Sequence, residues 1–260
     1  MDTAKYIERL GYRGDIQIDE VCLKALHKCH LMSIPFEVLD IHMGNKISLK
    51  LNKIFDKVIH RRRGGYCYEL NALFNAFLTQ IGYDSYLISA KIYDQGKFGP
   101  EFDHMAIIVR LDNLWLIDVG HGDLFIEPVQ IIPDVLQEGV FKHFKINKSD
   151  TNEYLLSESL KQETNFICKY KFSTVPRTVK EFEKLNLWKQ SSKESFFVQN
   201  RVCTLPNENG RKTIMNSTFK IKTENHIEKT EIKSDAQLLE ILKLEFNIDL
   251  KFIDRKIKIA

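Results

Sequence analysis

The sequence lacks an apolar run long enough to cross a membrane, because none of its hydrophobic stretches reaches the roughly 18 residues that a spanning helix needs. Its first residues, MDTAKY, also lack the apolar centre of a secretory signal peptide. Its five cysteines are an odd number, which fits a reducing compartment. We therefore expect a soluble protein of the cytoplasm with no membrane partner.

Sequence patterns typical of nucleic-acid-binding and metal-binding proteins are also scarce. The net charge is +3, and no dense basic stripe with interleaved aromatic residues occurs, so we expect no nucleic-acid partner. A helix-like stretch at 21–31 contains Cys22, His27, Cys29 and His30. It has no compact Cys-x-x-Cys pair, which disfavours a zinc site. We expect no metal. We expect four cysteines to be small buried hydrophobic residues: Cys22, Cys29, Cys168 and Cys203.

Composition and periodicity divide the chain into three regions. With 260 residues, 43% of them hydrophobic, the chain can form one large domain or two to three smaller ones. Helical periodicity runs to about Tyr83, strands dominate from Tyr86 to about Tyr170, and helix and strand mix after Thr178. Besides the helix at Cys67, the predicted helices span 3–10, 19–32, 51–59, 179–187 and 235–245. The predicted strands include 86–93, 104–110, 165–170, 196–205, 212–221 and 226–232.

Cys67 stands at the start of an apolar helix, just after two glycines, in the stretch Arg63–Asn71 (RGGYCYELN). Apolar residues then recur at helical spacing and predict a core-facing helix that ends at Gly82: Leu70, Leu73, Phe74, Phe77, Leu78 and Ile81. Unpaired N–H groups and the positive end of the helix dipole favour an anion at a helix N-terminus. Cys67 is therefore a candidate nucleophile that reacts as the thiolate.

A base and a group to orient it follow downstream. Two strand-like segments flank the turn signal at 112–113, which predicts a hairpin with His104 on its first strand and Asp118 on its second. The order Cys67, His104, Asp118 resembles the triad of papain-like cysteine enzymes. The sequence thus supplies a nucleophile, a general base and a carboxylate that orients the base.

The triad can form only if the loop of the predicted hairpin contains an odd number of residues or a strand contains a bulge. A plain two-residue turn would place Asp118 opposite Ile107, on the face away from His104. We therefore predict a loop of odd length, such as a three-residue turn with a bulge, or a bulge within one strand. Asp103 and Asp123 are competing carboxylates, but Asp103 adjoins His104 on a strand and must point to the opposite face.

Taken together, these blocks resemble the arylamine N-acetyltransferase family in its bacterial form. The matching blocks run in family order over most of the chain: IPFE at Ile34–Glu37, RGGxCxExN at Arg63–Asn71, a His before a hydrophobic strand at His104, DVGxG at Asp118–Gly122, and the segments Ser195–Phe197, Asn200–Cys203 and Asn209–Arg211. The resemblance implies an α+β fold in three parts. These are a helical bundle at 1–84, a central β-barrel-like domain at 85–186 and an α/β lid at 187–260.

The resemblance also implies a function. Enzymes of this family move an acetyl group from acetyl-CoA to an aromatic amine or hydrazine by a ping-pong reaction through a cysteine thioester. Carried over, Cys67 is the nucleophile, His104 the general base and Asp118 the carboxylate that fixes the imidazole tautomer. The family pairs the arginine of RGG with the glutamate of IPFE, which are Arg63 and Glu37 in this sequence.

The CoA contacts that the resemblance implies lie around the triad and in the lid. CoA lies between the second and third domains in the family, which indicates Phe98, Gly99, Lys212, Asn216 and Thr218. The Gly-containing loop after the catalytic strand adds Gly120 and Gly122. Backbone N–H groups in the loop at 120–123 could meet a phosphate or the pantetheine amides. The sequence departs from the family pattern at His121, where Phe is common, and at Val38, where Asn usually follows IPFE.

Two other functions stay open at this point. An amide synthase of the same family would use an acyl chain on a carrier protein. A binding protein that retains the fold without catalysis is the second alternative, although the intact triad opposes it. A papain-like protease is disfavoured because no propeptide, disulfide framework or secretory signal is present. The physiological acceptor, the acyl-chain preference and the oligomeric state do not follow from the sequence.

Overall fold

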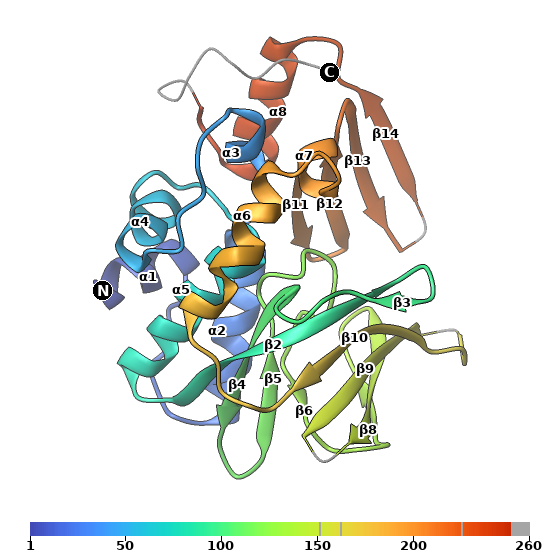
Figure 1. The fold of residues 1–260 in the computed structure, drawn as a ribbon. Helices are drawn as coiled ribbons and strands as arrows, with labels where there is room; N and C mark the ends of the chain where they lie inside the picture. The colour runs from blue at the N-terminus through green and yellow to red at the C-terminus, as the bar shows by residue number, and fades with distance from the viewer. Residues whose placement is uncertain (151, 162, 225, 251–260) are drawn as a thin grey trace.

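The computed structural model describes residues 1–150, 152–161, 163–224 and 226–250. Figure 1 shows α1, α2, α4 and α5 gathered together, a large curved sheet beside them, and a smaller sheet with α8 behind it. The helices, with the π-helix η1 and the 3-10 helix η2, are α1 Thr3–Leu10, α2 Glu20–Ser33, α3 Leu39–His42, α4 Leu51–Phe55, η1 Asp56–His60, α5 Cys67–Ile81, η2 Val179–Phe182, α6 Glu183–Ser191, α7 Phe196–Gln199 and α8 Asp235–Phe246.

The strands form two sheets. The larger has the order β6-β5-β4-β2-β10-β9-β8-β7, with β3 paired to β2, and the smaller has the order β1-β11-β12-β13-β14. Their bounds are β1 Phe36–Glu37, β2 Asp84–Asp94, β3 Lys97–Phe98, β4 His104–Arg110, β5 Leu114–Ile117, β6 Val129–Gln130, β7 Leu136–Glu138, β8 Lys142–Asp150, β9 Glu153–Leu160, β10 Ile167–Ser173, β11 Val202–Asn207, β12 Gly210–Met215, β13 Thr218–Thr223 and β14 Ile227–Glu231. The larger sheet is nearly closed and barrel-like, so the α+β fold is confirmed.

Local sequence signals account for the ends of the main helices. Asp19 caps α2, since its side chain accepts from the N–H of Cys22 at 2.8 Å. Helix α5 begins at Cys67 and ends before Gly82, whose φ of 113° is left-handed. Cys67 therefore lies in the first turn of a helix, as the sequence predicts.

Buried hydrophobic residues form three clusters. The first joins the N-terminal helices to one face of β4, and includes Tyr6, Leu26, Phe74, Met105, Ile107 and Val109. The second covers the other face of that sheet, and includes Ile88, Ala106, Ile108, Leu116 and Phe172. The third packs β12 and β13 on α8, and includes Ile214, Phe219, Leu238, Leu242 and Phe246. Because β4 sends alternate residues into the first two clusters, packing holds this strand from both sides.

The β4–β5 hairpin has the odd loop that the triad needs. Arg110 pairs with Leu114 and Ile107 pairs with Ile117, so three residues, 111–113, connect the strands. This register confirms the prediction. Asp118 is not within the second strand, as we had expected, but follows directly after β5.

Two predicted strands are wrong in part. The segment 196–205 contains the short helix α7 before β11 begins, and the segment 212–221 is a hairpin of β12 and β13. Asn216 turns this hairpin with a φ of 53°, a left-handed conformation that Asn tolerates better than most residues. The polar residues at 216–218 interrupt the apolar pattern between Met215 and Phe219, and the strand prediction wrongly continued through them. The C-terminal tail at 251–260 lies outside the described residues. Within the described part of the chain, no helix combines the length and the apolar character that a membrane crossing requires.

Buried charges join the start of α5 to β1. Arg63 Nη2 lies 2.8 Å and Nε 2.9 Å from Oε1 of Glu37, and both side chains are almost completely buried. The other carboxylate oxygen of Glu37 accepts from the N–H of Leu39 at 2.7 Å. Lys57 of η1 adds ion pairs to Asp40 at 2.6 Å and to Glu69 at 2.9 Å. The pairing of Arg63 with Glu37 that the resemblance implies is therefore present.

Removing the arginine should destabilise the protein. We expect Arg63→Met to lower the free energy of unfolding by about 3–5 kcal/mol, because it leaves the buried Glu37 carboxylate without its closest cation. Urea denaturation followed by circular dichroism measures this. The matched control is Arg110→Met, whose 2.9 Å pair with Asp84 is 58% exposed on both sides and should contribute at most about 1 kcal/mol. Equal losses in the two variants would contradict the role of the buried pair.

Candidate active site

The three predicted triad residues meet at the junction of α5, β4 and the segment after β5. Nε2 of His104 lies 2.6 Å from Oδ2 of Asp118. Cys67, His104 and Asp118 are each at most 3% exposed. Because Nε2 faces the carboxylate, Nδ1 is the imidazole nitrogen left to interact with the thiol of Cys67.

Mutual attraction keeps this pair charged in spite of burial. Burial opposes the imidazolium, but the charge and hydrogen bond of Asp118, helped by Cys67, raise the pKa of His104 well above 6.5. Burial likewise opposes the carboxylate, while His104 lowers the pKa of Asp118 below its usual 3.8. At neutral pH the site therefore holds an imidazolium beside a carboxylate.

Four donors hold the Asp118 carboxylate. Asn71 Nδ2 and the N–H of Gly120 both donate to Oδ1 at 3.0 Å. His104 and the Tyr170 hydroxyl donate to Oδ2, the latter at 3.3 Å. Asn71 belongs to the RGGxCxExN block, whereas nothing local in the sequence marked Tyr170, which comes from β10. A buried acceptor this well satisfied cannot turn away from His104 without losing several hydrogen bonds.

Glycine is required where the segment after β5 crosses α5. A Cβ on Gly120 would lie 2.6 Å from Cα of Cys67 and 2.7 Å from Nδ2 of Asn71. The same need for close approach applies to Gly64, where a Cβ would lie 1.9 Å from the carbonyl oxygen of Pro35. Gly120 thus lets the segment after β5 approach the nucleophile, and Gly64 lets the chain before α5 pass close to Pro35.

His121 places a second imidazole beside the triad. Its ring centroid lies 5.6 Å from that of His104 and 6.0 Å from that of Tyr170. Burial lowers the pKa of His121 to about 3, so the ring is neutral at physiological pH. Its Nδ1 is buried with no hydrogen-bond partner among the described residues. The position that departs from the family pattern therefore faces the catalytic pair.

The predicted CoA residues lie in four places. Phe98 ends β3 and is 41% exposed, and Gly99 follows it against the side chain of Asp103. Gly120 and Gly122 belong to the segment after the triad carboxylate. Lys212 in β12 forms an ion pair with Glu245.

The remaining two CoA candidates lie at the turn between β12 and β13. The Asn216 side chain bonds to the segment just before β11. Its Oδ1 accepts from the N–H of Arg201 at 2.9 Å, and its Nδ2 donates to Asn200 at 3.0 Å. Thr218 begins β13 and pairs with Glu231 of β14. The structure thus does not gather all seven residues around the thiol.

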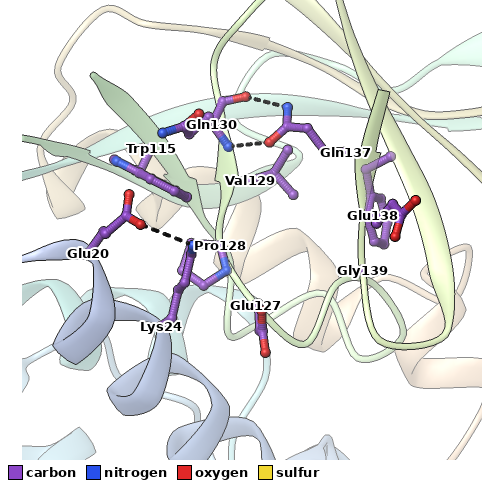
Figure 2. Close-up of a pocket in the computed structure, with 11 residues that line it drawn as sticks. Glu20, Lys24, Trp115, Glu127, Pro128, Val129, Gln130, Gln137, Glu138 and Gly139 are labelled. Atoms are coloured by element: carbon purple, nitrogen blue, oxygen red, sulfur yellow. Dashed lines mark hydrogen bonds and ion pairs between the residues drawn. The ribbon is translucent and has the colours of Figure 1, made fainter. Parts of the chain in front are cut away.

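Two cavities lie away from the triad. One of about 320 Å³ opens between α2 and the strands β5 to β7, where Gln130 and Gln137 exchange hydrogen bonds of 2.8 Å beside Trp115 (Figure 2). The other, of about 600 Å³, lies between α2 and the β11–β12 hairpin and is lined by residues that include Lys28 and Lys212. Neither is lined by a triad residue, and only the second contains a residue that the sequence associates with CoA.

Comparison with known proteins agrees with this geometry. A family model described as N-acetyltransferase matches residues 21–255. Human arylamine N-acetyltransferase 1 is 27% identical, over 96% of this chain and 95% of its own length.

The chain belongs to the arylamine N-acetyltransferase family. It is therefore a member of an acyltransferase enzyme family. The arylamine N-acetyltransferase of Mycobacterium smegmatis has a similar structure, with a TM-score of 0.90 and 25% identity over 98% of this chain and 95% of that one. The enzyme of Mycobacterium marinum in complex with CoA gives a TM-score of 0.89 at 23% identity, over 98% and 96% of the two chains. The cysteine, histidine and aspartate found here agree with the family's triad architecture.

The charge on His104 depends on Asp118. We expect the imidazole of His104 in the wild type to stay protonated through neutral pH, and Asp118→Asn to bring its pKa below 6.5, because burial then acts without the carboxylate. Nitrogen-15 NMR of the histidine rings measures both values. A wild-type His104 that loses its proton below pH 6.5 would contradict the ion pair.

The raised pKa of His104 in the wild type also makes the stability of the fold depend on pH. A folded pKa above the unfolded value of 6.5 means that His104 contributes stability fully below pH 6.5, and that this contribution is lost as the pH rises through the folded pKa. We therefore expect Asp118→Asn to remove this loss of stability at alkaline pH.

A side chain at position 120 should displace the nucleophile. We expect Gly120→Ala to lower kcat/KM for the family reaction by about 10²-fold, since the new methyl group must push Cys67 or Asn71 away. The matched control is Gly14→Ala, where the new methyl group meets only the side chain of Tyr12. Activity of Gly120→Ala within a few-fold of wild type would show that the close approach is unimportant.

Proposed function

We propose that this protein transfers an acetyl group from acetyl-CoA to an aromatic amine or hydrazine by a ping-pong reaction through a thioester on Cys67. The observation that carries the proposal is the buried imidazole of His104, which is bonded at Nε2 to Asp118 and whose raised pKa depends on Asp118 and Cys67. This arrangement pairs a nucleophile with a charged proton donor. Family membership makes the same reaction the expected one.

In the first half-reaction, the Cys67 thiolate attacks the thioester carbonyl carbon of acetyl-CoA. The bond between that carbon and the CoA sulfur breaks, and the departing CoA thiolate takes the Nδ1 proton of His104. The products are CoA, acetylated Cys67 and a neutral imidazole. Backbone N–H groups at the start of α5 are suited to stabilise the oxyanion formed on the way.

In the second half-reaction, the amine nitrogen attacks the acetyl carbon on Cys67. His104 accepts the N–H proton, the carbon–sulfur bond to Cys67 breaks, and the thiolate–imidazolium pair is restored. Aromatic amines are weakly basic and largely uncharged at neutral pH, so they attack without a strong base. General acid–base catalysis of this kind contributes about 10²–10⁴-fold in rate.

Acetyl-CoA enters this proposal as a co-substrate. The Mycobacterium marinum relative was solved in complex with CoA, which supports the choice of donor. We place CoA contacts at the residues indicated by the sequence, and among them favour Gly120, next to the thiol, and Lys212, in the cavity that also contains Lys28. Two cations at one cavity suit phosphate groups. The other contacts, at Phe98, Gly99, Gly122, Asn216 and Thr218, stay predictions.

The division of the chain and its location are also proposals. The resemblance supports three parts at 1–84, 85–186 and 187–260, although the first buried cluster extends across the first boundary and the last boundary falls within α6. A cytoplasmic location and the absence of a metal stay predictions. The proposed steps use protein groups and the two substrates.

Intact-protein mass spectrometry tests the proposal. After incubation with acetyl-CoA and no acceptor, we expect the wild type to gain one acetyl group and to lose it when an aromatic amine or hydrazine is added. Cys67→Ala should gain none. Cys29→Ala, which removes a partly buried thiol elsewhere, should behave like the wild type. A wild type that is not acetylated by acetyl-CoA would overturn the proposal, and acylation only by a carrier-bound chain would establish the amide synthase alternative.

A further inference from the structure

His27 of α2 is a completely buried side chain whose two ring nitrogens are both hydrogen-bonded. Nδ1 lies 2.8 Å from the carbonyl oxygen of Ile126, and Nε2 lies 3.4 Å from the backbone nitrogen of Asp118. One imidazole thus bridges the two ends of the segment 118–126, which carries the triad carboxylate. The face of its ring stacks on Phe125, with centroids 5.6 Å apart.

The partners of His27 determine its tautomer. A carbonyl oxygen only accepts and a backbone N–H only donates, so the proton must be on Nδ1 and the free electron pair on Nε2. Burial lowers the pKa of His27 to about 4, so the ring keeps this neutral form at physiological pH. In this state Nε2 is an acceptor for the N–H of Asp118.

Among the residues that the structure describes, none pairs as a strand with the first residues after β5. Three consecutive N–H groups, at 118, 119 and 120, are instead held by side-chain acceptors. Val119 donates to Asn71 at 3.0 Å, and Gly120 donates to the carboxylate of Asp118 itself. His27 is the acceptor for Asp118, and it is the contact that fixes the backbone from which the carboxylate projects.

We infer that His27 is a positioning residue, which aims the Asp118 carboxylate at His104 by accepting from the Asp118 N–H while anchoring Ile126. The inference rests on the proposed function for its kinetic consequence, but the geometry it describes does not. A displacement of about 1 Å at a catalytic group can cost about 10²-fold in rate.

His30, one turn further along α2, provides the matched control. It is equally buried, and its Nδ1 contacts the Tyr6 hydroxyl at 2.9 Å, on a path that does not reach Asp118. If His27 only fills the core, substitutions at His27 and His30 should have similar consequences. If His27 positions Asp118, only substitutions at His27 should alter the triad.

Two substitutions, His27→Asn and His27→Gln, test the two hydrogen bonds of His27 one at a time. The Asn side chain can place its amide nitrogen near the former Nδ1 and keep the bond to Ile126, while losing the acceptor for Asp118. The longer Gln side chain can place its amide oxygen near the former Nε2 and keep that acceptor. We expect His27→Asn to lower kcat by about 10²-fold with little change in KM, and His27→Gln to stay within about tenfold of wild type. His30→Gln should lose stability but keep kcat.

Two further readouts do not need the transferase reaction. We expect the pH dependence of Cys67 alkylation by iodoacetamide, and the nitrogen-15 signals of His104, to change in His27→Asn and to match the wild type in His30→Gln. The wild type alone gives a third test, since its nitrogen-15 signals should show His27 protonated at Nδ1. If wild type transfers no acetyl group, the proposed function fails while these measurements still decide the role of His27.

Three results would overturn the inference. They are a His27 proton on Nε2 in the wild type, equal effects of His27→Asn and His30→Gln on the alkylation profile, and a His27→Asn variant that is less stable but has the wild-type kcat and alkylation profile.

Discussion

The ion pair between His104 and Asp118 is the interaction on which the rest of the site depends. Transferring an imidazolium into the protein interior costs several kcal/mol unless a counter-charge lies beside it. The Asp118 carboxylate supplies that charge at 2.6 Å and is itself held by three donors besides His104. In the proposed mechanism, the charged ring is the counter-ion of the Cys67 thiolate. It also donates the proton that the leaving group takes. The chemistry we propose follows from this one pair.

The fold brings these groups together from distant parts of the chain. Helix α5 presents Cys67 at its N-terminus, β4 presents His104 from a strand packed on both faces, and the segment after β5 presents Asp118. Gly120 lets that segment cross α5, and the buried Arg63–Glu37 pair joins the start of α5 to β1. Rigid packing on every side means that the site is formed before any substrate binds.

The sequence predicts the parts of this site that depend on local pattern. Helical periodicity places Cys67 in the first turn of α5, and face alternation requires the odd hairpin loop that the structure contains. It does not predict Tyr170 or His27, because their contacts with Asp118 join residues 52 and 91 positions apart. The turn at Asn216 was missed although the polar residues at 216–218 interrupt the apolar pattern there, and the left-handed backbone of Asn216 marks its position. Contacts that arise from tertiary packing leave no periodic signal.

The central claim of the proposed mechanism is that Cys67 attacks as a thiolate beside an imidazolium whose charge depends on Asp118. The most direct measurement is the ultraviolet thiolate absorbance of the wild type minus that of Cys67→Ala at neutral pH, repeated in the Asp118→Asn background. We predict a thiolate band in the wild-type difference spectrum and its loss when Asp118 is neutralised. No band in the wild type, or an equal band in both backgrounds, would contradict the account.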